Sequence, residues 1–150
     1  MNNLKEQLYK MCIAYVQGRM NDARQSIEDA QDSSDEDTKS SAGDKYETGR
    51  EMMQQVADRG QAQLNEANKL MVALSTITYN TTHSKADTGS LVSTNYGKFY
   101  IAISAGTLSI DTQNYFAVSP ASPIGLKLSG KTAGDEFDLN GRAYRIESVA

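Results

Sequence analysis

A chain of 150 residues with 39% hydrophobic residues and a net charge of −4 is long enough for one ordinary domain or two small ones. Its single cysteine, Cys12, excludes an internal disulfide, and no apolar run approaches the roughly 18 residues that span a membrane. The acidic excess lies in residues 1–80, and residues 81–150 are neutral, so no basic face favours DNA binding. The N-terminus lacks a secretory pattern, and we expect a cytoplasmic protein with neither membrane nor sequence-specific DNA partners.

The first half of the chain has helical periodicity and contains no proline. Apolar or small residues recur at Leu4, Leu8, Met11, Tyr15, Ala23, Ile27 and Ala30. A second series steps alternately by three and four residues, as a heptad seam does, at Tyr46, Gly49, Met53, Val56, Gly60, Gln63, Ala67, Leu70 and Leu74. We expect two helices of roughly 28 and 31 residues that pair as an antiparallel coiled-coil hairpin over residues 1–80. The small seam residues would allow a close approach of the helices.

A polar, acid-rich segment connects the two predicted helices. It reads DAQDSSDEDTKSSAGD, and six of the ten residues from Glu28 to Asp37 are acidic, with no basic residue among them. The spacing predicts that these acids lie at the far tip of the hairpin, near residues 28–44. Asp44 stands at the start of the second helix, where a carboxylate suits the positive end of the helix dipole.

After a linker at residues 81–88, the apolar period changes from helical spacing to alternation, which predicts a second domain over residues 89–150. Short strands are expected at 90–95, 98–104, 107–110, 114–118, 137–139 and 142–149, the last two around an Asn140-Gly141 turn. Ser122 as N-cap, Pro123 in the first turn and Gly130 as the stop predict one short helix. The fold class is therefore α+β, a helical hairpin followed by a small, mostly antiparallel sheet.

The stretch from Gly125 to Thr132 reads GLKLSGKT and matches the phosphate-binding P-loop pattern. A P-loop needs a strand before its glycines and a helix that begins at the lysine. Here the predicted helix comes first and Gly130 ends it, so the amides after Lys131 cannot open a helix toward a phosphate. We interpret the match as coincidental.

The same region resembles the C-terminal domain of the Gre transcript-cleavage factors, whose pattern is roughly I-S-x-x-S-P-[IL]-G-x-x-L-x-G-[KR]-x-x-G-D. The matching residues are Ser119, Ser122, Pro123, Gly125, Leu128, Gly130, Lys131, Gly134 and Asp135. Gre proteins have an N-terminal antiparallel coiled coil followed by an FKBP-like domain, which agrees with the predicted order. The specific part of the resemblance covers about the last 60 residues.

The resemblance implies a transcription elongation factor that binds RNA polymerase and is not itself an enzyme. In the family, the C-terminal domain docks at the rim of the polymerase secondary channel, which here implies docking through Ser119, Ser122, Pro123, Ile124, Gly125 and Lys131. The coiled coil enters the channel, and two tip carboxylates help to hold magnesium and a water at the polymerase active site, where backtracked RNA is cleaved. The factor would need no cofactor of its own and would meet the RNA 3′ end indirectly.

The tip departs from the family pattern D-L-K-E-N-A-E-Y. Asp37 and Lys39 fit its start, and Tyr46 fits its end if two residues are inserted, but the second family acid falls on Ser40. Candidates for the missing carboxylate are Asp35, Glu36 and Asp44, and spacing alone does not choose among them; Asp35 and Asp37 are the expected metal-holding pair in the polymerase site. The loss of an acid at Ser40 favours an alternative, a non-cleaving Gre-like regulator of the same channel.

Other interpretations remain for these residues. A coiled-coil adaptor with an FKBP-like protein-binding domain is an alternative of another class, and the acid cluster is also compatible with a solvated loop. An EF-hand is disfavoured because Ser40 stands where the loop needs glycine. The methionines and Cys12 are expected to pack in or beside the seam, and the lone His83 cannot build a histidine metal site. Tyr96, Phe99 and Tyr100 are either core or docking residues.

Overall fold

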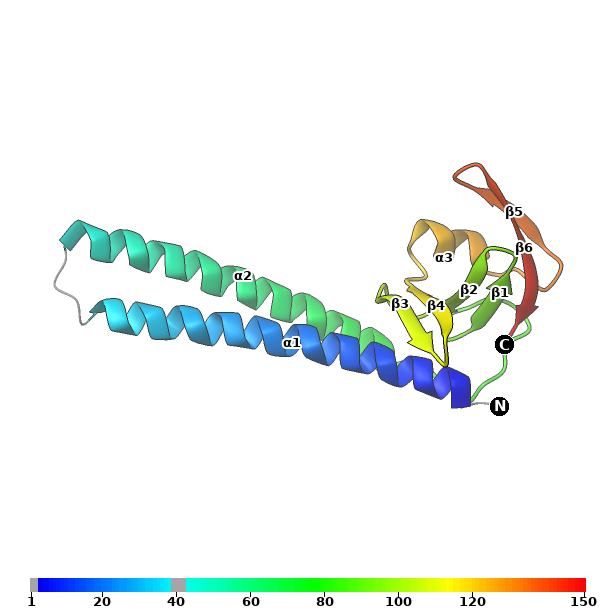
Figure 1. The fold of residues 1–150 in the computed structure, drawn as a ribbon, viewed down its shortest axis with the longest axis horizontal. Helices are drawn as coiled ribbons and strands as arrows, with labels where there is room; N and C mark the ends of the chain where they lie inside the picture. Colours follow the sequence, from blue (N-terminus) through cyan, green and yellow to red (C-terminus); the bar gives the residue numbers. More distant parts are fainter. Residues whose placement is uncertain (1–2, 39–42) are drawn as a thin grey trace. The chain divides into compact units, whose positions relative to one another are not determined.

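The computed structural model describes the backbone of residues 3–38 and 43–150 and the side chains of residues 4–32 and 49–150. The chain begins with two long helices, α1 (Asn3–Thr38) and α2 (Gly43–Ser75). Six strands and one short helix follow (Figure 1): β1 (Leu91–Thr94), β2 (Gly97–Ile101), β3 (Gly106–Ile110), β4 (Gln113–Val118), α3 (Pro123–Leu128), β5 (Glu136–Leu139) and β6 (Arg142–Val149). This is the predicted α+β architecture, with the helical hairpin before the sheet and one short helix within the second half.

Both long helices extend further than the sequence pattern predicted. α1 has 36 residues and α2 has 33, against the expected 28 and 31 or so. The predicted connecting segment is therefore mostly helical, and the acids from Glu28 to Asp37 belong to α1 and not to a loop. The physical reason is that no glycine or proline interrupts the chain between Gly18 and Gly43, while the acid-rich run is compatible with helix.

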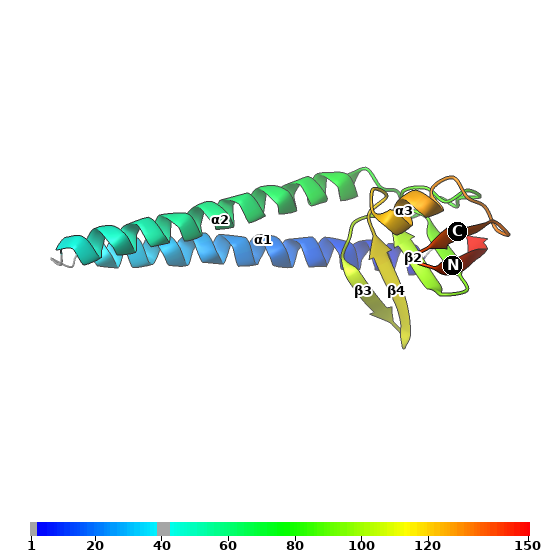
Figure 2. The same ribbon diagram turned by 90° about the horizontal axis from the view of Figure 1, so that it is seen from above.

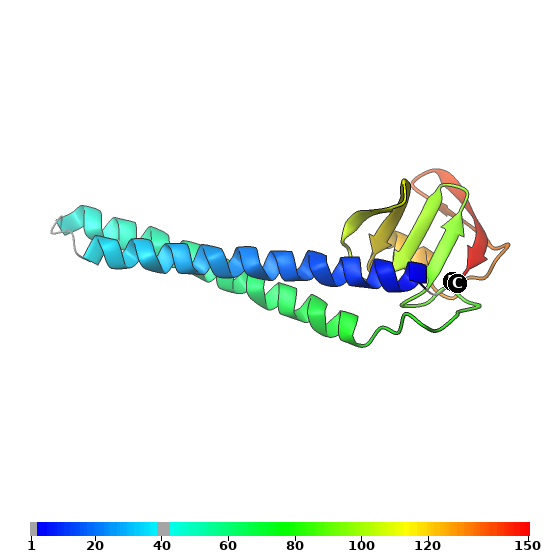
Figure 3. The ribbon, with the colours of Figure 1, turned by 60° about the horizontal axis from the view of Figure 1, so that its bottom comes forward.

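By packing, the chain divides into two compact units, one of Val16–Met71 and one of Met1–Tyr15 with Val72–Ala150. In the first unit, α1 and α2 run side by side and antiparallel (Figure 3). Gly60 marks the close approach of the two helices, because a Cβ atom there would lie 2.8 Å from Ile27 Cγ1 and 3.2 Å from the Ala23 carbonyl oxygen. The prediction that small seam residues permit close packing is confirmed at Gly60.

The seam itself runs one position away from the predicted one in part of each helix. Val16 is buried whereas Tyr15 is 38% exposed, and Gln63 is exposed whereas Leu64 is partly buried. In α1 the buried row continues from Cys12 to Val16 with a spacing of four residues. A straight helix has 3.6 residues per turn, so its buried stripe drifts relative to a strict seven-residue repeat.

The second unit contains a six-stranded sheet with the order β3-β4-β2-β1-β6-β5. β2 and β4 pair in parallel, and the other neighbours pair antiparallel, so the sheet is mostly antiparallel as predicted. The strand expected at 98–104 ends at Ile101. α3 lies against one face of the sheet (Figure 2), where Leu128 packs in a core with Val92, Phe99, Ile101 and Ile146.

The first turns of α1 belong to this second unit and are tied to it by specific bonds. Lys5, only 5% exposed, donates from Nζ to the Thr81 carbonyl oxygen at 2.6 Å and to the backbone oxygen of Ala150 at 3.3 Å. The Tyr9 hydroxyl donates to the Leu74 carbonyl oxygen at 2.9 Å. A buried ammonium that is satisfied by carbonyl oxygens fixes the positions of the segments that carry them.

Candidate functional site

The segment Ser119–Pro123 begins the motif that stands out in the sequence, and its serines are used to build a turn and a helix cap. The Ser122 amide and hydroxyl both donate to the Ser119 carbonyl oxygen, at 3.0 and 2.6 Å. The Gly125 amide donates to Ser122 Oγ at 3.1 Å, which makes Ser122 the N-cap of α3, and Pro123 stands in the first turn. The predicted cap is confirmed.

Gly125 is required by its closeness to the preceding turn. A Cβ atom at this position would lie 2.1 Å from the Ser119 carbonyl oxygen and 2.9 Å from Ser122 Oγ. The first of these atoms belongs to the backbone, so no side-chain rotation relieves the overlap. The spacing S-P-x-G is therefore the signature of a capped helix whose first turn folds back on the chain that enters it.

The end of α3 is shaped by the remaining motif residues. Gly130 has φ +78°, and its amide donates to the Ala86 carbonyl oxygen at 2.8 Å. The Thr132 amide donates to Asp135 Oδ2 at 2.8 Å, and Gly134, with φ +94°, donates to the Ile146 carbonyl oxygen at 2.7 Å. A turn and then β5 follow Lys131, so the expected departure from P-loop geometry is confirmed: the helix precedes the Gly-Lys-Thr sequence.

The predicted docking residues therefore separate into two kinds. Ser119, Ser122 and Gly125 shape the backbone, and Ile124 is partly buried against the sheet core. Pro123 is exposed, and Lys131 is partly exposed at the other end of the segment.

Leu126 lies on the same short helix as Pro123 and is 66% exposed. We call the surface formed by Pro123, Leu126 and Lys127 the α3 face; all three are exposed. Leu126 is not among the docking residues predicted from the sequence. In the sequence, Leu126 is an apolar residue midway between Ile124 and Leu128. A helix that turns Ile124 and Leu128 toward the core turns Leu126 toward solvent.

The predicted tip acids lie at the junction of the two long helices. Asp35, Glu36 and Asp37 fall in the last turn of α1, and Asp44 is the second residue of α2. Their side chains, and Ser40 altogether, lie outside the described residues. Among the described side chains, no group of three histidine, cysteine, aspartate or glutamate residues is placed to hold a metal ion.

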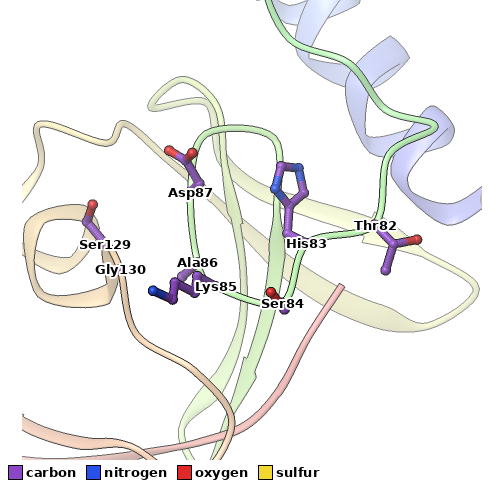
Figure 4. A pocket seen from close by; sticks show the side chains of 8 residues that line it. All are labelled: Thr82, His83, Ser84, Lys85, Ala86, Asp87, Ser129 and Gly130. Atoms are coloured by element: carbon purple, nitrogen blue, oxygen red, sulfur yellow. The ribbon is translucent and has the colours of Figure 1, made fainter.

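A polar cavity of about 460 Å³ lies in the second unit, between the linker and the end of α3 (Figure 4). It is lined by Thr82, His83, Ser84, Lys85, Ala86, Asp87, Ser129 and Gly130. The Nε2 atom of His83 is buried and has no hydrogen-bond partner. Burial and the nearby charge of Lys5 lower the pKa of His83, and Asp87 acts in the opposite direction. The lowered pKa favours the neutral form of His83 in the folded protein.

Two of the three aromatic residues that the sequence left open, Phe99 and Tyr100, are core residues, and Tyr96 is exposed. Phe99 is 8% exposed and Tyr100 is fully buried, so both are core residues, whereas Tyr96 is 48% exposed. The buried Tyr100 hydroxyl has no hydrogen-bond partner, and desolvation together with Cys12 and Tyr9 raises the pKa of Tyr100.

No known family model and no curated protein matches the sequence. Among solved structures, the chain is similar to that of the transcription factor Gfh1, with 20% sequence identity and a TM-score of 0.35, over 94% of this chain and 92% of that one. No helix in the described part of the chain is long and apolar enough to cross a membrane. The function is therefore inferred from the residues themselves.

Proposed function

We propose that this protein is a transcription factor of the Gre type that binds RNA polymerase through its second unit and inserts its helical hairpin into the secondary channel. The observation that carries the proposal is the union of two features in one chain. The S-P-x-G motif builds a capped helix with an exposed face, and the hairpin carries a dense set of carboxylates in the last turn of α1. We expect the protein to act in the cytoplasm.

α1 is long enough to place the acidic residues of its last turn far from its first turn. Its 36 residues rise about 54 Å at 1.5 Å per residue, so the acids at its end are far from the first turn that Lys5 anchors. Lys5 and Tyr9 bind the first turns of α1 within the second unit, and Gly60 lets α1 and α2 approach closely at Ala23 and Ile27. A narrow, anchored hairpin is the kind of element that enters a channel in another protein.

The chemistry proposed for the tip needs no pocket in this protein. Magnesium takes one or two carboxylates together with phosphate oxygens and waters, and two metal ions stabilise the attacking and leaving oxygens of phosphodiester hydrolysis. Asp37 with Asp35, Glu36 or Asp44 would supply carboxylates to an ion that the polymerase and its RNA also hold. The chain is then not an enzyme by itself and has no cofactor of its own.

The docking role falls on the α3 face. Pro123 and Leu126 present apolar surface to solvent, and Lys127 adds a positive charge. Exposed apolar residues carried on a well-capped helix are suited to a protein partner, because little conformational entropy is lost when they bind. In this proposal the α3 face supplies affinity for polymerase and the tip supplies chemistry.

The test is RNA cleavage in a backtracked elongation complex with the cognate polymerase. We expect shortened transcripts with the wild-type protein, none with Asp35→Ala/Asp37→Ala, and unchanged polymerase binding by that variant. The matched variant Leu126→Ser should weaken polymerase binding while leaving the acids in place. Full cleavage by the double variant would show that these carboxylates are not the functional ones.

A second candidate function is favoured by Ser40, which stands where the family pattern has an acid. A non-cleaving regulator would occupy the same channel and block access to it. In the same assay it would produce no shortened RNA but would protect the complex from an added cleavage factor. If the protein neither cleaves nor protects, and polymerase does not copurify with it, an adaptor for other proteins replaces both candidates.

A further inference from the structure

One face of the sheet carries a continuous row of aromatic rings, which we call the aromatic row. Ring centroids are 5.5 Å apart for Phe116 and Phe99, and 6.4 Å apart for Phe99 and Tyr144. Tyr144 stacks on Phe137 at 5.0 Å and meets Tyr96 edge to face at 5.0 Å. The row crosses β4, β2, β6 and β5 and includes the turn between β1 and β2. Phe99, Phe137 and Tyr144 also belong to the core against which α3 packs, and the row includes no residue of the α3 face or of the tip.

Two members of the aromatic row are open to solvent. Tyr96 is 48% exposed and Phe116 is 37% exposed, whereas Phe99 and Phe137 are buried. Gly97, the residue after Tyr96, leaves room for the Phe116 ring, because a Cβ atom there would lie 3.0 Å from Phe116 Cε2 and would push that ring away. Packed partners hold the rings in place, so the exposed surfaces are ordered before any ligand arrives.

A guanidinium group completes this surface. The Arg142 Cζ atom lies 5.3 Å from the centroid of the Tyr96 ring, within the range of a cation–π contact. Arg142 follows the turn between β5 and β6, while Tyr96 comes from the turn between β1 and β2, so two hairpins meet at this point. The contact leaves a fixed positive charge beside an exposed aromatic ring.

The charges of the sheet are divided between its faces. Strand residues alternate in direction and paired residues share a face, so the registers, joined through the Thr94–Ile146 pair, place Arg142, Tyr144, Phe137, Phe99 and Phe116 on one side. Across the six strands, all within the described chain, Arg142 is the sole charged residue on that side. The acids Glu136 and Asp138 alternate with these residues and lie on the opposite side.

We propose that the aromatic row is a binding surface for single-stranded RNA, in which bases stack on Tyr96 and Phe116 and Arg142 contacts a phosphate. Flat exposed rings, one cation and no acid match the two parts of a nucleotide, its π face and its negative charge. An acidic peptide would match only the charge of Arg142, and a basic peptide would be repelled by it. The choice of RNA over DNA rests on the proposed function in transcription. The proposal that bases stack on this surface is independent of that function.

The test uses the full chain without polymerase, so that its result is independent of the proposed function. A fluorescein-labelled ten-nucleotide oligouridylate is titrated and followed by anisotropy. Loss of one stacked base costs about 1–3 kcal/mol, so Tyr96→Ala and Phe116→Ala should each weaken binding by about fivefold or more. Tyr96→Phe keeps the ring and should bind like the wild type. Arg145→Gln removes a charge from the opposite face and should also leave binding unchanged.

Salt and sugar chemistry sharpen the test. A single contacted phosphate gives a slope of about −0.7 in a plot of log affinity against log salt concentration, and Arg142→Gln should flatten that slope to near zero. A deoxythymidylate oligomer should bind more weakly than the RNA. The proposal is overturned if wild-type protein does not bind the oligouridylate, if both alanine variants bind like the wild type while remaining folded, or if DNA binds as tightly as RNA.

Discussion

The α-carbon of Gly125 faces the carbonyl oxygen of Ser119 so closely that a Cβ atom would lie only 2.1 Å from it. The same oxygen accepts hydrogen bonds from the amide and the hydroxyl of Ser122. One carbonyl group therefore closes the turn, orients the N-cap and limits residue 125 to glycine. The geometry explains why serine, proline and glycine occur at this spacing.

Gly125→Ala should destabilise the second unit strongly. The overlap is with backbone and can be relieved only by moving the turn or the start of α3, and overpacking of this kind costs up to about 3 kcal/mol. The loss would appear as a lower urea midpoint followed by tyrosine fluorescence, since the chain has eight tyrosines and no tryptophan. Leu126→Ala on the same helix is the control and should change the free energy of unfolding by less than about 0.5 kcal/mol. Equal stability of the two variants would contradict the close approach.

Substitution by alanine should change the stability of the protein differently at two glycines of the hairpin. A Cβ atom added to Gly18 would have no atom within 4 Å, so Gly18→Ala should stabilise the helix by about 0.5–1 kcal/mol. Gly60→Ala gains the same helix propensity but places a methyl group 2.8 Å from Ile27 Cγ1, so it should be neutral or destabilising. Thermal unfolding followed by helical circular dichroism compares the pair. A stabilising Gly60→Ala would mean that the helices separate there at little cost.

The comparison of Cys12 with Ser122 shows which features follow from sequence. The cap at Ser122 is a local interaction over four residues, so a short pattern sufficed to predict it together with the glycine stop. The buried row of Cys12 and Val16 depends on which side of α1 meets another element, and a pattern that tolerates both Tyr15 and Val16 does not decide this. Tertiary packing selected the four-residue spacing.

The aromatic row and the α3 face show a second limit of prediction from sequence. Tyr96 and Phe99 are recognisable as aromatic residues, but their meeting with Tyr144 depends on pairing between segments about 48 residues apart, as the Asn95–Ala143 hydrogen bond shows. Strand order was not predictable because β4 pairs in parallel with β2, not with a strand that follows it. Local motifs were therefore recovered, whereas surfaces assembled from several strands were not.

Acidification should destabilise the second unit through His83. Burial and Lys5 lower the pKa of His83 in the folded protein, so below its ordinary value of about 6.5 the unfolded chain binds the proton more tightly. Stability is then fully present above about pH 6.5 and decreases as the pH falls toward the folded-state pKa. Urea unfolding between about pH 7.5 and 5 measures this slope. His83→Gln should reduce the slope in that range, and Lys5→Met should move the histidine pKa, followed by NMR, back toward its ordinary value. An unchanged slope in His83→Gln would assign the pH dependence to other groups.

Cys12 should be protected from alkylation while the protein is folded. The side chain is fully buried, and desolvation raises the pKa of the thiol to about 11. At about pH 8 the thiolate, which is the reactive species, is then at least about a hundredfold scarcer than for a thiol of ordinary pKa, about 8.5. Iodoacetamide labelling of Cys12, followed by mass spectrometry, should be slow in buffer and fast in urea. In Gly60→Ala, the labelling rate of the folded protein should rise only if the hairpin opens as far as Cys12. Rapid labelling of the stable native protein would show that the base of α1 separates from the sheet without global unfolding, and that Lys5 and Tyr9 do not hold it in place.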